Sequence, residues 1–199
     1  MERRYKQMLI DSETHAEIKE AKEILYRMSG RKLNSKEVID EFLGRRLRLL
    51  RLDDKIRVYI NAFASAAAAN SHVLGLLLFG SVAKGTFGPN SDIDILVVVD
   101  GGAMDYFDEV HDMIESVEGL RDPLRATGKN LSITPLMLSA KRLGSFRPIY
   151  IDFLEDGVIL FERNETLSMF LNDIRKSVDY ERVAVGNSVM LRWRIKRQH

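Results

Sequence analysis

The sequence contains no cysteine, which excludes disulfide bonds and metal sites built from thiolates. No apolar run approaches the length of about 18 residues that a membrane-spanning helix needs, so we expect no transmembrane segment. The charged start, Glu2-Arg3-Arg4, leads into no long apolar stretch, so the sequence predicts no secretory signal and a cytoplasmic location. The formal net charge is only +1, which gives no overall signal for binding a polyanion.

The chain does have enough apolar material for a packed core, since 45% of its 199 residues are hydrophobic. This length suits one domain or two small ones. Basic residues outnumber acidic residues in the first 51 positions, and the reverse holds in the rest. We expect a separate module at 1–50, a connecting helix at 51–71 and the main domain at 72–199.

The most informative segment is 76–99, which reads LLLFGSVAKGTFGPNSDIDILVVV. A first apolar run ends at Gly80-Ser81, a linker rich in glycine follows, and a second apolar run carries Asp92 and Asp94 at its start. Short apolar runs bounded by turn residues are typical of strands buried on both faces. The segment therefore predicts two strands joined through a glycine turn and a short helix.

The spacing of the polar residues in this segment indicates an anion and cation site. Residues i and i+2 of a strand point to one side, so Asp92 and Asp94 project together, and a cation such as Mg2+ or Mn2+ would offset their repulsion. Gly80 lets a ligand approach the backbone, and the N–H groups after Ser81 can hold phosphate. Lys84, one turn later, can reach a phosphate or lie in solvent. A strand turn with solvated aspartates remains the plain alternative.

This arrangement resembles the signature of the nucleotidyltransferases of the DNA polymerase beta superfamily, in which Gly-Ser is followed after a spacer by Asp-x-Asp. The order Lys-Gly-Thr at 84–86 does not fit the rival P-loop pattern. The resemblance implies that Gly80 and Ser81, with Lys84 and Ser91, bind a nucleoside triphosphate such as ATP. It also implies that Asp92 and Asp94 are catalytic and hold a metal pair, Mg2+ or Mn2+, that clamps both oxygens of an in-line displacement.

Alternating strand and helix patterns surround this motif and predict an α/β (α+β) fold with a mixed sheet and flanking helices. We expect one face of that sheet to be open. The expected elements are a helix at 53–69, the two motif strands, a helix at 106–117, strands at 130–138 and 157–161, a helix at 166–178, and a hairpin around Gly186-Asn187. We expect Trp193 to pack within that hairpin rather than stack on a base.

The superfamily usually supplies a third carboxylate from the next strand, and this chain departs from that pattern. The positions where it is expected carry Ser132 or Thr134, neither of which replaces the charge or acts as a carboxylate base. Asp122, Asp152 or Glu155 could approach from elsewhere in the fold. Nucleotide binding and catalysis are therefore separate predictions for this chain.

The N-terminal fifty residues show a short extended segment, a helix, a glycine turn and a second helix. This pattern, over 5–43, resembles the ribbon-helix-helix fold, which implies a homodimer whose strand ribbon enters the major groove of DNA. Alternation places Tyr5, Gln7 and Leu9 outward. The expected DNA contacts are Tyr5, Lys6, Gln7, Leu9, Ser35 and Lys36. A dimerisation module without a DNA partner is the alternative.

Taken together, the chain looks like a minimal nucleotidyltransferase fused behind a ribbon-helix-helix module. The implied reaction moves a nucleoside monophosphate from a nucleoside triphosphate to a hydroxyl acceptor. Some such proteins are antitoxins that transfer AMP to a tyrosine of a helical HEPN toxin, so a toxin of this type is a possible partner. The alternatives are a nucleotide-sensing DNA-binding regulator with little or no activity and an antitoxin that acts by binding alone.

Overall fold

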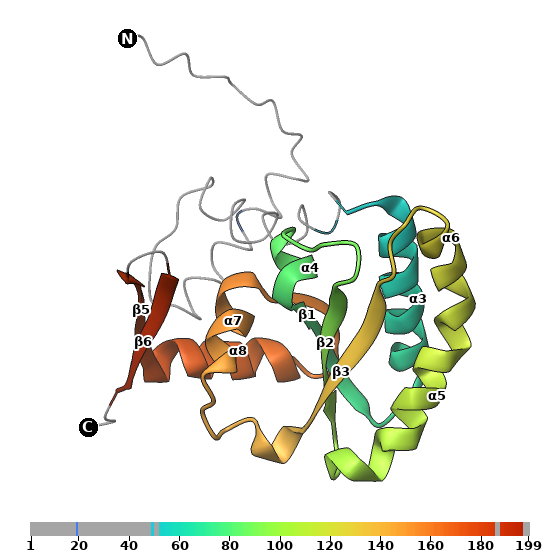
Figure 1. The fold of residues 1–199 in the computed structure, drawn as a ribbon. Coiled ribbons are helices and arrows are strands. Elements are labelled where there is room, and N and C mark those ends of the chain that lie inside the picture. The colour runs from blue at the N-terminus through green and yellow to red at the C-terminus, as the bar shows by residue number, and fades with distance from the viewer. Residues whose placement is uncertain (1–18, 20–48, 50–51, 186–187, 197–199) are drawn as a thin grey trace. The chain divides into compact units, whose positions relative to one another are not determined.

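The computed structural model describes residues 19, 49, 52–185 and 188–196 of the chain (Figure 1). The chain divides into two units, Met1–Arg45 and Arg46–His199, and nearly all described residues belong to the second. Within those described residues, no helix is both long and apolar enough to cross a membrane. The ribbon-helix-helix prediction, with Tyr5, Lys6, Gln7, Leu9, Ser35 and Lys36, lies outside the described residues.

A four-stranded mixed sheet in the order β3-β2-β1-β4 forms the centre of the second unit. Its strands are β1 (Val73–Phe79), β2 (Asp92–Val99), β3 (Ser132–Ser139) and β4 (Val158–Glu162). β1 is antiparallel to β2 and β4, whereas β2 and β3 are parallel. Both motif strands are buried almost throughout, as their continuous apolar runs predict.

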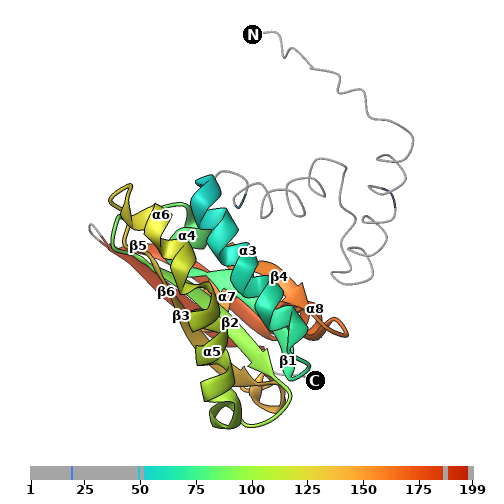
Figure 2. The same ribbon diagram turned by 90° about the vertical axis from the view of Figure 1, so that its right-hand side faces the viewer.

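One face of the sheet is covered by α3 (Asp54–Ala69) and α5 (Phe107–Val117) (Figures 1 and 2). Asp53 caps α3 by accepting a hydrogen bond from the Lys55 amide, which satisfies a donor that the first turn leaves free. The apolar side predicted for this helix is fully buried: Ile56, Tyr59, Ile60 and Phe63. Short helical turns complete this layer: η1 (Ala103–Tyr106), η2 (Glu118–Arg121) and α6 (Asp122–Arg125).

The other face is also covered, so the expectation of an open sheet face is wrong. A turn, η3 (Ala140–Arg142), leads towards α7 (Ile149–Asp156), and α7 packs with α8 (Thr166–Ser177) against this face (Figure 1). Tyr150 and Phe153 of α7 are fully buried there, and Phe153 meets Phe79 with ring centroids 4.9 Å apart. These aromatic side chains are part of the apolar core between the sheet and the layer formed by α7 and α8.

The chain after α8 forms the predicted hairpin from β5 (Val178–Val185) and β6 (Ser188–Ile195). An isolated two-stranded ribbon is only marginally stable, so it needs packing against the rest of the domain. Trp193 provides such packing, because its ring lies 5.0 Å from that of Phe146 between centroids. The expected packing of Trp193 within the hairpin is thus replaced by a contact with Phe146, which lies outside the hairpin.

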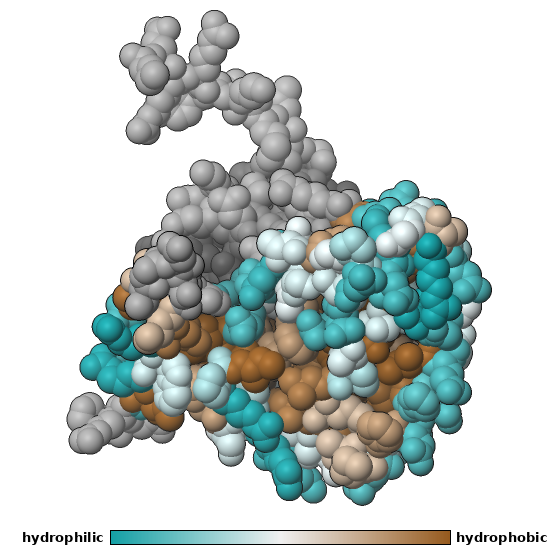
Figure 3. Space-filling model, in the orientation of Figure 1, coloured by the Kyte–Doolittle hydropathy of each residue, from teal (hydrophilic) through white to brown (hydrophobic). Residues whose placement is uncertain are grey.

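β3 is an edge strand, and this position explains how it accommodates a proline. Proline has no N–H, so in the middle of a strand it is tolerated only where that donor would face away from the ladder. Pro135 pairs with Ile95 in the register of β2 and β3, and its other side faces no strand of the described sheet. Pro135, Leu136 and Met137 of this strand are half-buried. Figure 3 shows hydrophobic surface on the face of the domain that is turned towards the viewer.

Candidate functional site

The turn between β1 and α4 (Gly80–Lys84) is built around a glycine that two constraints require. Gly80 has φ +72°, a left-handed conformation that L residues adopt at a cost. A Cβ at this position would also overlap Oδ2 of Asp94, which stands opposite Phe79 in the strand register. Gly80 therefore allows the carboxylate of Asp94 to lie directly against the turn.

Asp92 and Asp94 lie on the same face of β2, as the i, i+2 spacing predicts. This face continues into buried Leu96 and Val98, so the two carboxylates occupy its open end near α4. Asp92 is exposed and Asp94 is half-buried. Burial, and then the neighbouring charge of Asp92, raise the pKa of Asp94 above its ordinary value. The ionised form of Asp94 is therefore disfavoured, and the positive charge of a bound cation would offset the effects of burial and of Asp92.

The neighbouring strand carries hydroxyl groups where a third carboxylate was expected. Ser132 stands opposite Asp92 and Thr134 opposite Asp94 in the parallel register. Ser132 Oγ donates a hydrogen bond of 3.4 Å to Asp92 Oδ1. In the part of the chain that the structure describes, no group of three His, Cys, Asp or Glu side chains is placed to hold a metal ion. Among those residues, neither Asp122, Asp152 nor Glu155 completes such a group.

Lys84 extends from α4 towards α7 and meets two carboxylates there. Its Nζ lies 3.4 Å from Asp152 Oδ1 and 3.6 Å from Asp156 Oδ2. Local pattern could not predict this contact, because the partners are 68 or more residues away and α7 was not predicted. Lys84 is thus placed beside the turn and forms ion pairs with two carboxylates of α7.

Ser91 has a structural contact in the loop that precedes β2. Its Oγ accepts a hydrogen bond of 2.8 Å from the Gly88 amide, so it closes the turn that leads to Asp92. The same loop is joined to the start of β3, because the Asn130 amide donates to the Pro89 carbonyl at 2.7 Å. These bonds fix the approach of both strands to the carboxylate pair.

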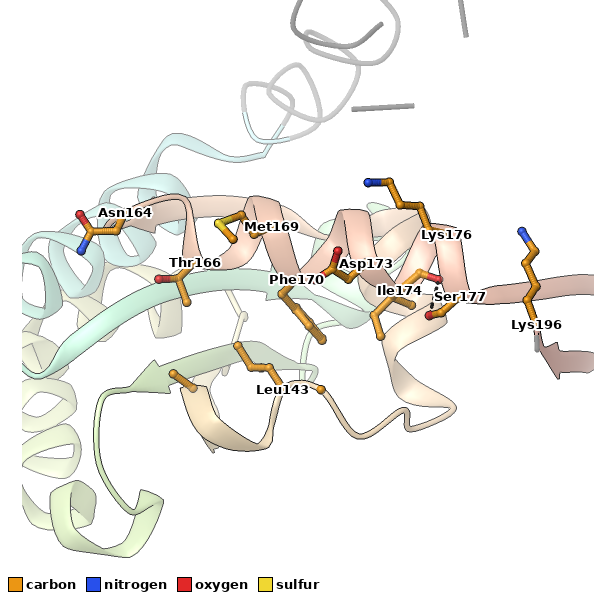
Figure 4. A pocket seen from close by; sticks show the side chains of 12 residues that line it. Leu143, Asn164, Thr166, Met169, Phe170, Asp173, Ile174, Lys176, Ser177 and Lys196 are labelled. Atoms are coloured by element: carbon orange, nitrogen blue, oxygen red, sulfur yellow. Dashed lines mark hydrogen bonds between the residues drawn. The ribbon is translucent and has the colours of Figure 1, made fainter. Parts of the chain in front are cut away.

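A groove of about 980 Å³ lies elsewhere, along α8 (Figure 4). Its lining combines apolar side chains with Asp173, Lys176 and Lys196, and Leu143 closes one side. Gly80, Ser81, Asp92 and Asp94 are not part of its lining. This groove is therefore separate from the carboxylate site at the end of the sheet.

Comparison with known proteins is consistent with this geometry. Residues 60–133 match the family model described as a nucleotidyltransferase domain, and this stretch contains the turn, both aspartates and Ser132. A comparison with curated proteins finds no match to the chain.

Solved structures of toxin–antitoxin complexes show a distant likeness. One, a toxin–antitoxin with AMP-PNP, is 18% identical, has a TM-score of 0.39 and covers 58% of this chain and 83% of its own. A variant of the toxin–antitoxin MntA-HpeT is 17% identical, with a TM-score of 0.38 and coverage of 56% and 80%. A second variant is 14% identical, with a TM-score of 0.38 and coverage of 63% and 85%.

Proposed function

We propose that this protein binds a nucleoside triphosphate with Mg2+ at the end of the sheet and transfers its nucleoside monophosphate to a hydroxyl acceptor. One observation carries the proposal. The paired carboxylates of Asp92 and Asp94 lie against the left-handed Gly80 turn, within a stretch that matches nucleotidyltransferase domains. ATP is the natural first substrate to test, and pyrophosphate is the other product.

The donor set fits Mg2+. Both candidate ligands are carboxylates, oxygen donors of the type that this cation prefers, and Mg2+ commonly completes its coordination with substrate phosphates and water. The raised pKa of Asp94 supports a cation at this place, because positive charge would offset the burial and repulsion that disfavour the ionised form. When bound, Mg2+ would neutralise phosphate charge in the transferring group.

Residues of the chain itself would bind and position the phosphates of the nucleotide. Gly80 and Ser81 begin α4 at the end of β1, where backbone N–H groups beside the Asp94 carboxylate can bind phosphate oxygens. Lys84 lies on the same short helix, and a phosphate would compete with Asp152 and Asp156 for its ammonium group. Asp92 and Asp94 fix where the α-phosphate lies relative to this turn.

A second candidate function is nucleotide binding without efficient transfer. The observation that favours it is the pair of hydroxyl groups, Ser132 and Thr134, opposite the two aspartates. A hydroxyl does not take up the proton of an attacking alcohol as a carboxylate does. A protein of this kind would sense nucleotide, or act as an antitoxin by binding alone.

Two measurements on one variant test the proposal. Calorimetry with a non-hydrolysable ATP analogue and Mg2+ reports binding, and pyrophosphate release reports transfer. We expect Asp92→Asn combined with Asp94→Asn to lose Mg2+-dependent binding. Unchanged binding in this variant would refute the site, whereas binding by the wild type without pyrophosphate release would favour the second candidate.

The partners are also part of the proposal. We propose that the N-terminal fifty residues form a homodimeric ribbon-helix-helix module that binds DNA, on the sequence pattern described above. The resemblance to minimal nucleotidyltransferases supports a protein acceptor, such as the tyrosine of a HEPN-type toxin. Light scattering tests the dimer, and co-expression with the product of a neighbouring gene tests the acceptor.

A further inference from the structure

The strand order places three kinds of group side by side at one end of the sheet. The Gly80-Ser81 turn follows β1, the two aspartates begin β2, and Ser132 begins β3. Neighbouring strands are about 4.8 Å apart, so the turn and Ser132 are separated by about two strand spacings, or roughly 10 Å. The carboxylates lie between them.

The order of these groups across the sheet, from the turn through the aspartates to Ser132, matters for phosphoryl transfer. If the departing pyrophosphate lies over the Gly80-Ser81 turn and the α-phosphate over the aspartates, the side opposite the leaving group faces β3. An in-line displacement needs its attacking oxygen on that side. Ser132 supplies a hydroxyl there, on the same face of the sheet as Asp92.

Ser132 is also oriented by a contact that suits a nucleophile. Its Oγ donates to Asp92 Oδ1 at 3.4 Å, so the hydroxyl proton already points to a carboxylate. The side chain is half-buried in a rigid strand, which limits the positions that the oxygen can take. Positioning of this kind is a large part of what an enzyme contributes to a displacement at phosphorus.

We propose that Ser132 is itself an acceptor and that the protein nucleotidylates its own chain at this residue. The inference rests on the proposed nucleoside triphosphate binding. Ser132 Oγ forms a bond to the α-phosphorus, and the bond from that phosphorus to the oxygen bridging to the β-phosphorus breaks. Pyrophosphate leaves with the electron pair of that bond. The hydroxyl proton passes to water, so the products are seryl nucleoside monophosphate, pyrophosphate and a proton.

Thr134 provides a matched control on the same strand. It stands opposite Asp94, two pairs further along the register, and its side chain is exposed. Its hydroxyl is secondary, and the adjoining methyl group hinders attack. The proposal therefore assigns the modification to Ser132 and not to Thr134.

The test uses the full chain with Mg2+ and, in separate reactions, ATP, GTP, CTP and UTP. Intact mass spectrometry measures any added nucleotide, and fragmentation locates it. Calorimetry with a non-hydrolysable analogue measures binding independently of transfer. We expect one nucleoside monophosphate per chain at Ser132, its loss in Ser132→Ala, and its retention in Thr134→Ala.

The two measurements separate the possible failures. If the analogue binds and no nucleotide becomes attached, or if it becomes attached at another residue, the inference is refuted and the proposed function stands. If the analogue does not bind to the wild type, both are refuted. An adduct that persists in Ser132→Ala likewise overturns the assignment.

Discussion

The sharpest prediction concerns Gly80→Ala, because the structure separates its two consequences. The first is backbone strain, since φ is +72° and an alanine in the left-handed region costs about 1–2 kcal/mol. The second is the overlap of the new Cβ with Asp94 Oδ2, the outer end of a side chain that can rotate away. Forcing that side chain from its rotamer costs about 0.5–1.5 kcal/mol more.

Gly128 offers a matched control, because it has φ +76° and a Cβ there would meet nothing within 4 Å. Gly128→Ala therefore measures the backbone strain alone. We expect both variants to fold, with Gly80→Ala less stable than Gly128→Ala by about 0.5–1.5 kcal/mol. Urea unfolding followed by circular dichroism measures both free energies of unfolding.

Binding should separate the two variants much more strongly than stability does. Gly80→Ala displaces the Asp94 carboxylate from the turn, so we expect affinity for Mg2+ with an ATP analogue to fall by about tenfold or more, or 1.4 kcal/mol. Gly128→Ala should bind as the wild type does. Equal affinity in the two folded variants, measured by calorimetry, would refute the argument that the Gly80 turn positions Asp94 for a ligand.

Three further predictions concern Asp94, Lys84 and Gln7. Burial and Asp92 raise the pKa of Asp94, so the free energy of unfolding of the wild type falls as pH rises through that pKa. We therefore expect Asp94→Asn to be more stable than the wild type near about pH 7, and this gain to be smaller below about pH 4. Urea titrations at both values measure this, and an equal difference at the two would contradict it. Replacing Asp152 and Asp156 together by Asn should raise affinity for the ATP analogue by about two- to fivefold by releasing Lys84, and the gain should vanish in a Lys84→Met background. A gain that persists there would mean that Lys84 is not the cause. Gln7→Ala should reduce the discrimination between DNA sequences, measured by fluorescence anisotropy, because an amide can pair with adenine; binding without sequence preference in both proteins would leave dimerisation as the supported function of the module.

The two strands of the motif could be predicted because each is an apolar run. The apolar runs before Gly80 and after Asp94 have no polar alternation, and strands of this kind must be central in a sheet. The family resemblance pointed to Ser132 or Thr134 as the place of the missing carboxylate, and the register puts these residues opposite Asp92 and Asp94. The two motif strands, in contrast, were predicted from local pattern alone.

Of the second helical layer, α8 was predicted, but α7 was missed because it has no clear helical period. Apolar side chains at 149–151 and 153–154 leave little polar face, and a short segment of this kind fits a buried strand equally well. Without α7, the sheet seemed open on one side, and the carboxylates that engage Lys84 could not be placed. Contacts between residues far apart in the chain are set by tertiary packing, which local pattern does not record.

The proline in β3 has a consequence for how an acceptor can approach. A polypeptide that joined the free edge of β3 as a fifth strand would find no N–H donor at Pro135, in the middle of the strand. Sheet extension is thereby discouraged on the side of the domain from which we propose that the attacking oxygen arrives. A protein acceptor would therefore need to offer its hydroxyl on a protruding side chain, from a helix or a loop tip, rather than from a strand laid along this edge.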